Sequence, residues 1–326
     1  MSETANRQVV NTAEGFFGAL RSPDLATAMS MLRAVAQNPG AALAFGKVND
    51  RDIVDELIRQ SNQKEGVTFL EVVFGALAAF DDPRAVEHFV KVLHTWSNPQ
   101  IVRLAAARLT HEPVESIEAK VRPLLMQDQS PLHATAAADI LIPVRTLTTE
   151  ERVRITVANS EGVDIGPELS AETARSWAHA LTGWFAPQAR LVLSSRDEDA
   201  VPALAPLWDD LDVDSKNWLL ALGVAKSPLE VIPLLRRALG DAEPRVVLGA
   251  LSTLQTMEAG KALFVNALTP LLAHPEPKIR CLAIQAGARH KDWRGFLAGE
   301  TEPEVIVWAA RRLAEAEGDA ALDTLE

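Results

Sequence analysis

The sequence predicts an all-α fold, an α-solenoid of stacked antiparallel helix pairs, and three observations carry this prediction. A proline recurs along the chain, at Pro99, Pro131, Pro244, Pro277 and Pro303. An alanine stands six residues after each of them, at Ala105, Ala137, Ala250, Ala283 and Ala309. Apolar residues predominate two and ten positions after the prolines. Such a recurrence is typical of repeat proteins, in which each repeat packs on the next.

Each of these prolines is expected to begin a helix, because proline at the first helical position gives up no intrahelical hydrogen bond and already has a helical φ. Positions +2, +6 and +10 then share one face, so they predict a buried stripe. The alanine in this stripe would let a neighbouring helix approach closely. The segments before the prolines, such as residues 114–125 and 229–239, are also helical in pattern. The unit is therefore helix, short turn, helix.

One further copy of the unit is expected between the two groups of prolines. Asp212 takes the place before the proline, Ser215 replaces the proline itself, and Ala221 takes the place of the alanine.

The chain is expected to have three parts. Residues 1–142 form an N-terminal solenoid half with atypical capping repeats, residues 143–170 an irregular kink or insertion, and residues 171–326 a C-terminal solenoid half. Capping repeats are expected because the terminal unit of a solenoid has one unstacked face.

Residues 14–80 lack the recurring proline, but residues 25–35, 53–58 and 68–80 carry helical patterns. In the irregular part, residues 148–151 resemble a capping box that opens a helix, whereas residues 153–157 alternate like a strand. Helix, hairpin and loop are all open here, and we favour a helix followed by a loop through two glycines, Gly162 and Gly166.

Composition narrows the classes of partner. The chain has 32 Lys and Arg residues against 44 Asp and Glu residues, a net charge of −12, which disfavours nucleic acid as a partner. No apolar stretch reaches the roughly 18 residues of a membrane span. The first residues show no secretion signal, and a single cysteine fits a reducing compartment, so we expect a cytoplasmic protein.

The motifs that carry enzyme chemistry are incomplete. Gly40 to Val48 imitates a phosphate-binding loop with the wrong spacing, and Asp210, Asp212 and Asp214 imitate only the first ligands of a calcium loop. The seven His residues show no zinc-ligand spacing, and Cys281 has no activating signature. We therefore expect no catalytic residues, no metal and no cofactor.

The recurring units resemble a known family. Residues 241–251 and 274–283 are similar to HEAT repeats, closest to the short bacterial type of phycobilisome-lyase-like proteins, whose pattern is Asp-x-x-Pro-x-Val-Arg-x-x-Ala. The acidic residue is matched by Asp128, Asp241 and Glu300, and the arginine by Arg280 alone. The polar ladder, in which the arginine of one repeat contacts the aspartate of another, is therefore expected to be mostly absent. The resemblance covers residues 83–142 and 215–315. It implies a right-handed solenoid with a binding role.

The candidate site is the exposed stripe of the second helix in each unit, at positions +1 and +8. In the last three units these positions place Arg245, Lys278 and Arg311 in a basic row, with Gln285 and Trp308 beside it. One alternative is that these residues form an ordinary solvent-exposed helix face, whose cations only offset neighbouring Asp and Glu. The functional alternative is a groove for an acidic peptide or an anionic ligand, since solenoids bind along such surfaces.

The function expected from these observations is a non-enzymatic scaffold, adaptor or assembly factor that binds a protein partner. Two alternatives stay open: a subunit that attaches a bilin-like chromophore, and, with weaker support, a HEAT-like DNA glycosylase. Trp177 and Trp184 lie seven residues apart and either line a ligand groove or pack in the core. The sequence does not indicate an oligomeric state.

Overall fold

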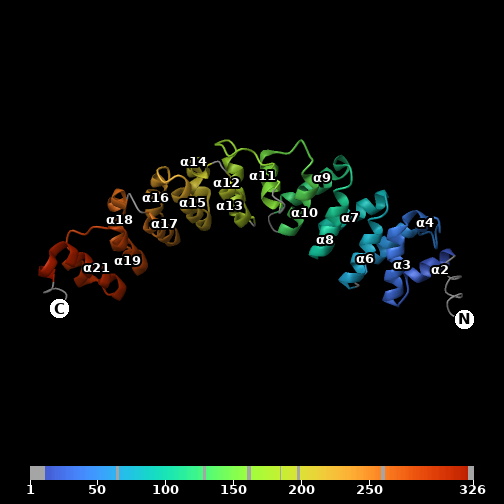
Figure 1. Cartoon of the computed structure of the whole chain (residues 1–326), viewed down its shortest axis with the longest axis horizontal. Coiled ribbons are helices and arrows are strands. Elements are labelled where there is room, and N and C mark those ends of the chain that lie inside the picture. The colour runs from blue at the N-terminus through green and yellow to red at the C-terminus, as the bar shows by residue number, and fades with distance from the viewer. Residues whose placement is uncertain are drawn as a thin grey trace. The chain divides into compact units, whose positions relative to one another are not determined.

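The computed structural model describes residues 12–63, 66–127, 130–159, 163–183, 185–196, 199–257 and 261–321. These residues are helical or lie in turns and loops, with no strand among them beyond one isolated bridge between Val48 and Arg51. The all-α prediction is confirmed (Figure 1). The chain divides into two compact units, residues 1–166 and 167–326. None of the described helices is long and apolar enough to cross a membrane.

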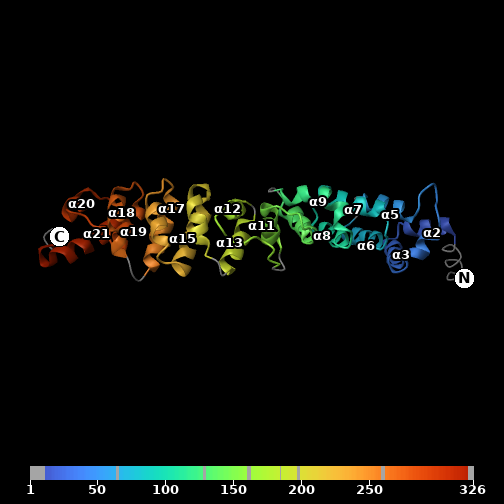
Figure 2. The same cartoon turned by 90° about the horizontal axis from the view of Figure 1, so that it is seen from above.

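The first unit consists of two rows of helices. Its helices are α2 (Ala13–Leu20), α3 (Leu25–Gln37), α4 (Pro39–Leu43), α5 (Ile53–Ser61), α6 (Val67–Leu77), α7 (Pro83–Thr95), α8 (Pro99–Leu109), α9 (Val114–Leu125), α10 (Pro131–Leu141) and α11 (Thr149–Ala158). Helices α5, α7, α9 and α11 pack in that order, and so do α3, α6, α8 and α10. Figure 2 shows α5, α7 and α9 lying beside α6 and α8. Each helix therefore packs mainly on helices close to it in sequence.

The second unit follows the same plan. Its elements are α12 (Ala174–Thr182), α13 (Ala186–Ser195), α14 (Ala200–Leu204), η1 (Ala205–Asp210), α15 (Val213–Lys226), α16 (Val231–Leu239), α17 (Pro244–Thr256), η2 (Lys261–Phe264), α18 (Val265–Leu268), η3 (Thr269–Ala273), α19 (Pro277–Ala286), α20 (Trp293–Gly299), α21 (Pro303–Glu317) and η4 (Gly318–Ala321). Helices α13, α15, α17, α19 and α21 pack in that order, and α14, α16, α18 and α20 pack against them.

The proline pattern explains where the helices begin. Five helices start at the five recurring prolines, namely α8, α10, α17, α19 and α21, and we call them the proline helices. The alanine six residues into each proline helix has no exposed surface. The leucines at +10 in four of them are also buried. The predicted buried stripe is confirmed by the burial of these alanines and leucines.

The register predicted for the copy between the proline groups was wrong. Helix α15 begins at Val213, and Asp212 caps it by accepting a hydrogen bond from the Ser215 backbone at 2.7 Å. Counted from Val213, the buried Ser215 stands at +2 and not in the proline place. Ala221 is exposed. The close approach occurs at Gly223 instead, where an added Cβ would lie 2.5 Å from Val231 Cγ2 of α16.

The helices predicted at the N-terminus and the capping box predicted at residues 148–151 are present in the structure. Helices α3 and α5 cover the segments 25–35 and 53–58, and α6 covers the segment 68–80 up to Leu77, with residues 78–80 in the turn that follows. Helix α11 opens with the predicted capping box between Thr148 and Glu151, so residues 153–157 are helical and not a strand. Gly162 lies outside the described residues, and Gly166 is in a loop. The division into three parts stays a prediction.

Two pairs of the polar ladder are present in the second unit, one more than the match of Arg280 alone predicts, while four of the five proline helices carry an apolar residue in the arginine place. Arg280 pairs with Glu300 through two hydrogen bonds of 2.7 Å, and Lys216 pairs with Asp241 at 3.1 Å. With α15 counted from Val213, Lys216 stands at +3 like Arg280. Both acids precede the next proline by three residues. The pair of Lys216 and Asp241 was missed because a lysine takes the place of the arginine in a unit without proline. Asp128 lies outside the described residues.

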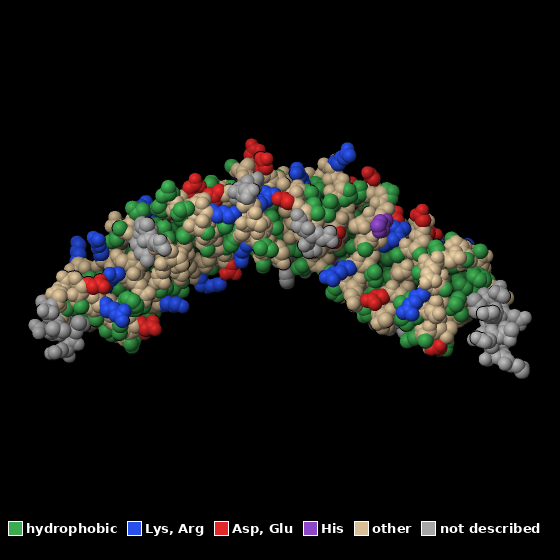
Figure 3. Space-filling view, in the orientation of Figure 1, with side chains coloured by type: hydrophobic (Ala, Val, Ile, Leu, Met, Phe, Trp, Pro, Cys, Tyr) green, Lys and Arg blue, Asp and Glu red, His purple; other side chains and the backbone are tan. Residues whose placement is uncertain are grey.

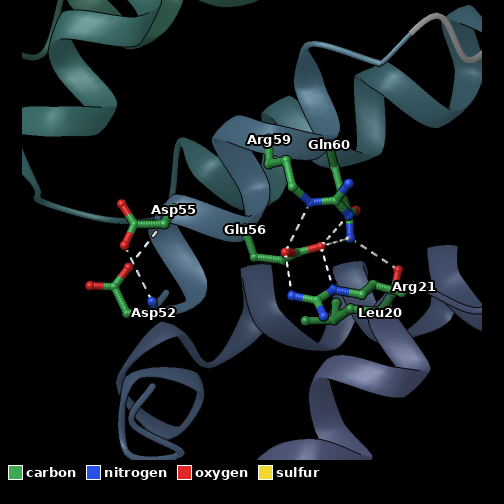
Figure 4. A network of polar contacts seen from close by, with 7 residues as sticks. All are labelled: Leu20, Arg21, Asp52, Asp55, Glu56, Arg59 and Gln60. Carbon is green, nitrogen blue, oxygen red and sulfur yellow. Dashed lines mark hydrogen bonds and ion pairs between the residues drawn. The ribbon is translucent and has the colours of Figure 1, made fainter. Parts of the chain in front are cut away.

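A buried carboxylate ties α2 to α5 in the first unit. Glu56 has no exposed surface and accepts hydrogen bonds from both Arg21 and Arg59, each through two nitrogens, at 2.6–3.1 Å (Figure 4). Gln60 also donates to Glu56, and to the Leu20 carbonyl at the end of α2. Burial alone would raise the pKa of Glu56, but these hydrogen bonds lower it from 4.5 to about 2.

Candidate functional site

The predicted basic row lies on packed proline helices. Arg245 of α17 is exposed and pairs with Asp214 of α15 at 3.1 Å, and both side chains are more than 60% exposed. Lys278 of α19 is exposed and makes no ion pair with any described residue. In Figure 3, Lys and Arg side chains alternate with Asp and Glu side chains along the lower edge of the second unit. The exposed Arg245 pair contributes little to stability.

The other predicted residues are engaged with their neighbours. The Arg311 guanidinium lies over the Trp308 ring, 4.6 Å from its centroid. Gln285 accepts a hydrogen bond from Gln255 of α17 at 2.9 Å and donates to Cys281 Sγ at 3.3 Å. Cys281 is buried, and burial raises the pKa of its thiol. The structure thus places these residues on one row of helices, and their role in binding stays a prediction.

A groove of about 520 Å³ lies between two proline helices of the first unit. It runs between α8 and α10, and we call it the α8–α10 groove. Small side chains form much of its lining, namely Ala106, Ala107, Thr110, Thr135 and Ala136, together with Leu132. Arg103 and Asp139 are its two charged lining residues. Because alanines and threonines fill little space between two helices, the surface there is hollow.

Sequence reasoning missed this groove because it read the exposed stripe only in the last three units. The same positions, +1 and +8, fall on Gln100 and Ala107 in α8 and on Leu132 and Asp139 in α10. Three of these four residues line the groove. The available signal was the number of alanines in α8 and α10, which exceeds what the buried stripe uses.

The acidic segment before α15 is used mainly in structural contacts. Asp212 caps α15, Asp214 pairs with Arg245, and Asp209 pairs with Arg237 of α16. In the described part of the chain, no group of three His, Cys, Asp or Glu side chains is placed to hold a metal ion. Two of the three aspartates with calcium-like spacing, Asp212 and Asp214, thus serve in a helix cap and an ion pair.

Trp177 belongs to the core and does not line a groove. Its side chain is fully buried, and the Arg196 guanidinium lies over its ring at 4.6 Å from the centroid. Trp184 lies outside the described residues.

One buried pair has the residue types of a nucleophile and a base. Ser61 Oγ lies 2.7 Å from His88 Nε2 and donates to the Ile58 carbonyl at 2.8 Å. Burial, with the nearby charge of Lys91, lowers the pKa of His88 to about 4. Ser61 has no exposed surface, and the His88 ring stacks on Phe74. A substrate cannot reach this hydroxyl, so the pair is a polar contact within the core.

Comparison with known proteins assigns no family. No protein-family description matches the sequence, and no curated protein matches it. A crystal structure of an engineered protein from a structural genomics consortium aligns with a TM-score of 0.29 and 16% identity, over 96% of each chain.

Proposed function

We propose that the chain is an α-solenoid of HEAT-like repeats with a right-handed superhelix, related to the short bacterial repeats of phycobilisome-lyase-like proteins. Three features support this proposal: the proline and alanine phase, the two rows of helices in each unit, and the ladder pairs Arg280–Glu300 and Lys216–Asp241. The ladder pairs occupy the positions that the family pattern gives to arginine and aspartate.

As its function we propose a non-enzymatic cytoplasmic scaffold, adaptor or assembly factor that binds a protein partner on the proline helices. The α8–α10 groove carries this proposal. Its volume of about 520 Å³ accommodates several side chains of a peptide. Its alanine lining allows the partner's backbone to approach closely. Arg103 and Asp139 supply opposite charges that would orient the bound segment.

Site-specific photo-crosslinking tests this function. A photoreactive phenylalanine at Ala107 faces the groove, whereas the same residue at Ala119 is exposed on α9 in the other row and serves as the matched control. In lysate of the native host we expect one protein to be crosslinked from position 107 and not from position 119. Thr135→Trp fills the groove and should remove that crosslink. Identical crosslinks from both positions, or none from 107, would refute the groove as the binding site.

The basic row on the proline helices of the second unit is a further surface proposed for binding the partner. Reversal of both Arg245 and Lys278 to Glu should abolish capture of the partner in a pull-down, because it removes two exposed cations and repels acidic groups. Unchanged recovery of the partner would remove the basic row from the proposal while leaving the groove in place.

A further inference from the structure

A second hollow of about 520 Å³ lies in the second unit, away from the predicted stripe. It forms where α19 ends and α20 begins, beside the last turns of α21. Its lining includes Arg289, His290 and Lys291 from the connecting loop, Trp293 from α20 and Arg312 from α21. We call it the basic hollow.

Local structure fixes the loop that carries these cations. Gly287 ends α19 with a positive φ of 107°, and the Ala288 backbone donates to the Ala283 carbonyl at 2.9 Å, which closes the helix end. Asp292 then caps α20 by accepting from the Gly295 backbone at 2.9 Å. The His290 ring contacts the rings of Trp293 and Phe296. The loop is therefore held at both ends.

The charge of the hollow is positive in a strongly acidic unit. Residues 167–326 contain 16 Lys and Arg residues against 23 Asp and Glu residues. Arg289 and Lys291 are nevertheless exposed together and form no ion pair with the described residues. The one acid in the lining, Glu317, is paired with Arg294 at 2.6 Å. Arg289 and Lys291 thus line the hollow without an ion-pair partner among the described residues.

The third cation is held in a fixed position. Arg312 donates from two nitrogens to the Ile284 carbonyl, at 3.0 and 3.3 Å, and from the third to Glu315 at 2.8 Å. Its guanidinium therefore shapes the wall and adds positive potential, while Arg289 and Lys291 keep donors for a ligand. The rest of the lining is largely small or apolar, with Val265, Ala286 and Trp293 among it.

We propose that the basic hollow binds an acidic segment of a protein partner, with side-chain carboxylates on Arg289 and Lys291 and an apolar side chain on the surface formed by Val265 and Trp293. Charge complementarity argues for this occupant, because Arg289 and Lys291 form no ion pair within the described part of the chain. The size and apolar lining exceed what a lone anion fills. The inference rests on the proposed protein-binding function but concerns a separate site.

Fluorescence anisotropy with the full chain tests this proposal. The probe is a labelled peptide that alternates Glu-Glu-Leu, and its control is the same peptide with Gln for Glu. We expect the acidic peptide to bind, the neutral one not to bind, and affinity to fall as salt rises. Reversal of both Arg289 and Lys291 to Glu should weaken binding about tenfold or more. Reversal of two exposed cations of the first unit, Arg33→Glu with Lys47→Glu, changes the net charge equally and should leave affinity within about twofold.

Three results would overturn the proposal. Unchanged affinity after reversal of Arg289 and Lys291 would show that the hollow is not used. An equal loss in the Arg33 and Lys47 variant would show a dependence on net charge alone. Displacement of the peptide by inorganic phosphate at matched ionic strength would show that the site recognises a free oxyanion. Crosslinking from Ala107 in the Arg289 and Lys291 variant reports on the groove separately, so failure of either site is distinguishable.

Discussion

Replacement of Glu56 by Gln should destabilise the first unit by about 3 kcal/mol at pH 7. Burial opposes ionisation of Glu56, but hydrogen bonds from Arg59, Arg21 and Gln60 lower its pKa from 4.5 to about 2. At ~1.4 kcal/mol for each unit of pKa, this lowering corresponds to about 3 kcal/mol in favour of the folded, ionised state. The substituted glutamine keeps the shape of the side chain but loses the charge that two guanidinium groups share (Figure 4).

The dependence on pH separates this mechanism from a packing defect. Below pH 4.5 the unfolded chain binds a proton at Glu56 that the folded protein does not bind. The contribution of Glu56 is therefore complete above pH 4.5 and is lost as the pH falls towards 2. The difference in unfolding free energy between wild type and Glu56→Gln should shrink to about half at pH 3.

Urea denaturation at pH 7, 5 and 3 measures this difference, and hydrogen exchange of peptides from α2 and α5 shows that the loss is local to these helices. Glu14→Gln changes an exposed carboxylate on α2 and is the matched control, expected to stay within about 0.5 kcal/mol of wild type. A loss below 1 kcal/mol at pH 7, or a difference that stays constant down to pH 3, would refute the reasoning.

Three further predictions concern the core. Burial holds His88 neutral and lowers its pKa to about 4, so the folded protein should lose stability as the pH falls from 6.5 towards 4. In His88→Leu this part of the loss should disappear from urea denaturation at these pH values. If the loss persists in the variant, His88 is not its cause. Ala250→Leu should lower the free energy of unfolding by about 1–3 kcal/mol in urea denaturation, because Ala250 is fully buried. Ala221→Leu on the exposed surface of α15 should leave it almost unchanged. Equal effects of the two substitutions would support the predicted register, in which Ala221 takes the place of the buried alanine. Gly223→Ala should destabilise the protein by more than 1 kcal/mol, because the added Cβ would collide with Val231 of α16. Gly75→Ala has open space around it and should stabilise α6 by about 0.5–1 kcal/mol. Melting temperatures that shift in the same direction for both variants would contradict the close approach at Gly223.

Local signals made much of the fold predictable. A proline at the first helical position acts within one turn, so Pro99 and Pro277 fix helix starts without any tertiary information. The alanines at +6 follow from the same register. In α15 the signal was different, because Asp212 caps the helix and Val213 stands where a proline would. A search phased on proline therefore placed that copy two residues too far along the chain.

The features that sequence reasoning missed depend on residues far apart in the chain. The α8–α10 groove needs small side chains on two helices that face each other, and neither helix alone marks it. The Glu56 network brings Arg21 from 35 residues away onto a carboxylate that otherwise looks like an ordinary helix-surface acid. The ladder pair of Lys216 and Asp241 needed the correct register of α15 before it could be recognised.

Small-angle X-ray scattering of the monomer tests the central claim, that the helix pairs stack into a solenoid, most directly. A compact globular chain of 326 residues has a radius of gyration of about 20 Å. A solenoid built as proposed should give a value well above this, with a pair-distance distribution that has a long tail. A radius of gyration near 20 Å, with a symmetric distribution, would contradict the solenoid and with it the proposed binding surface.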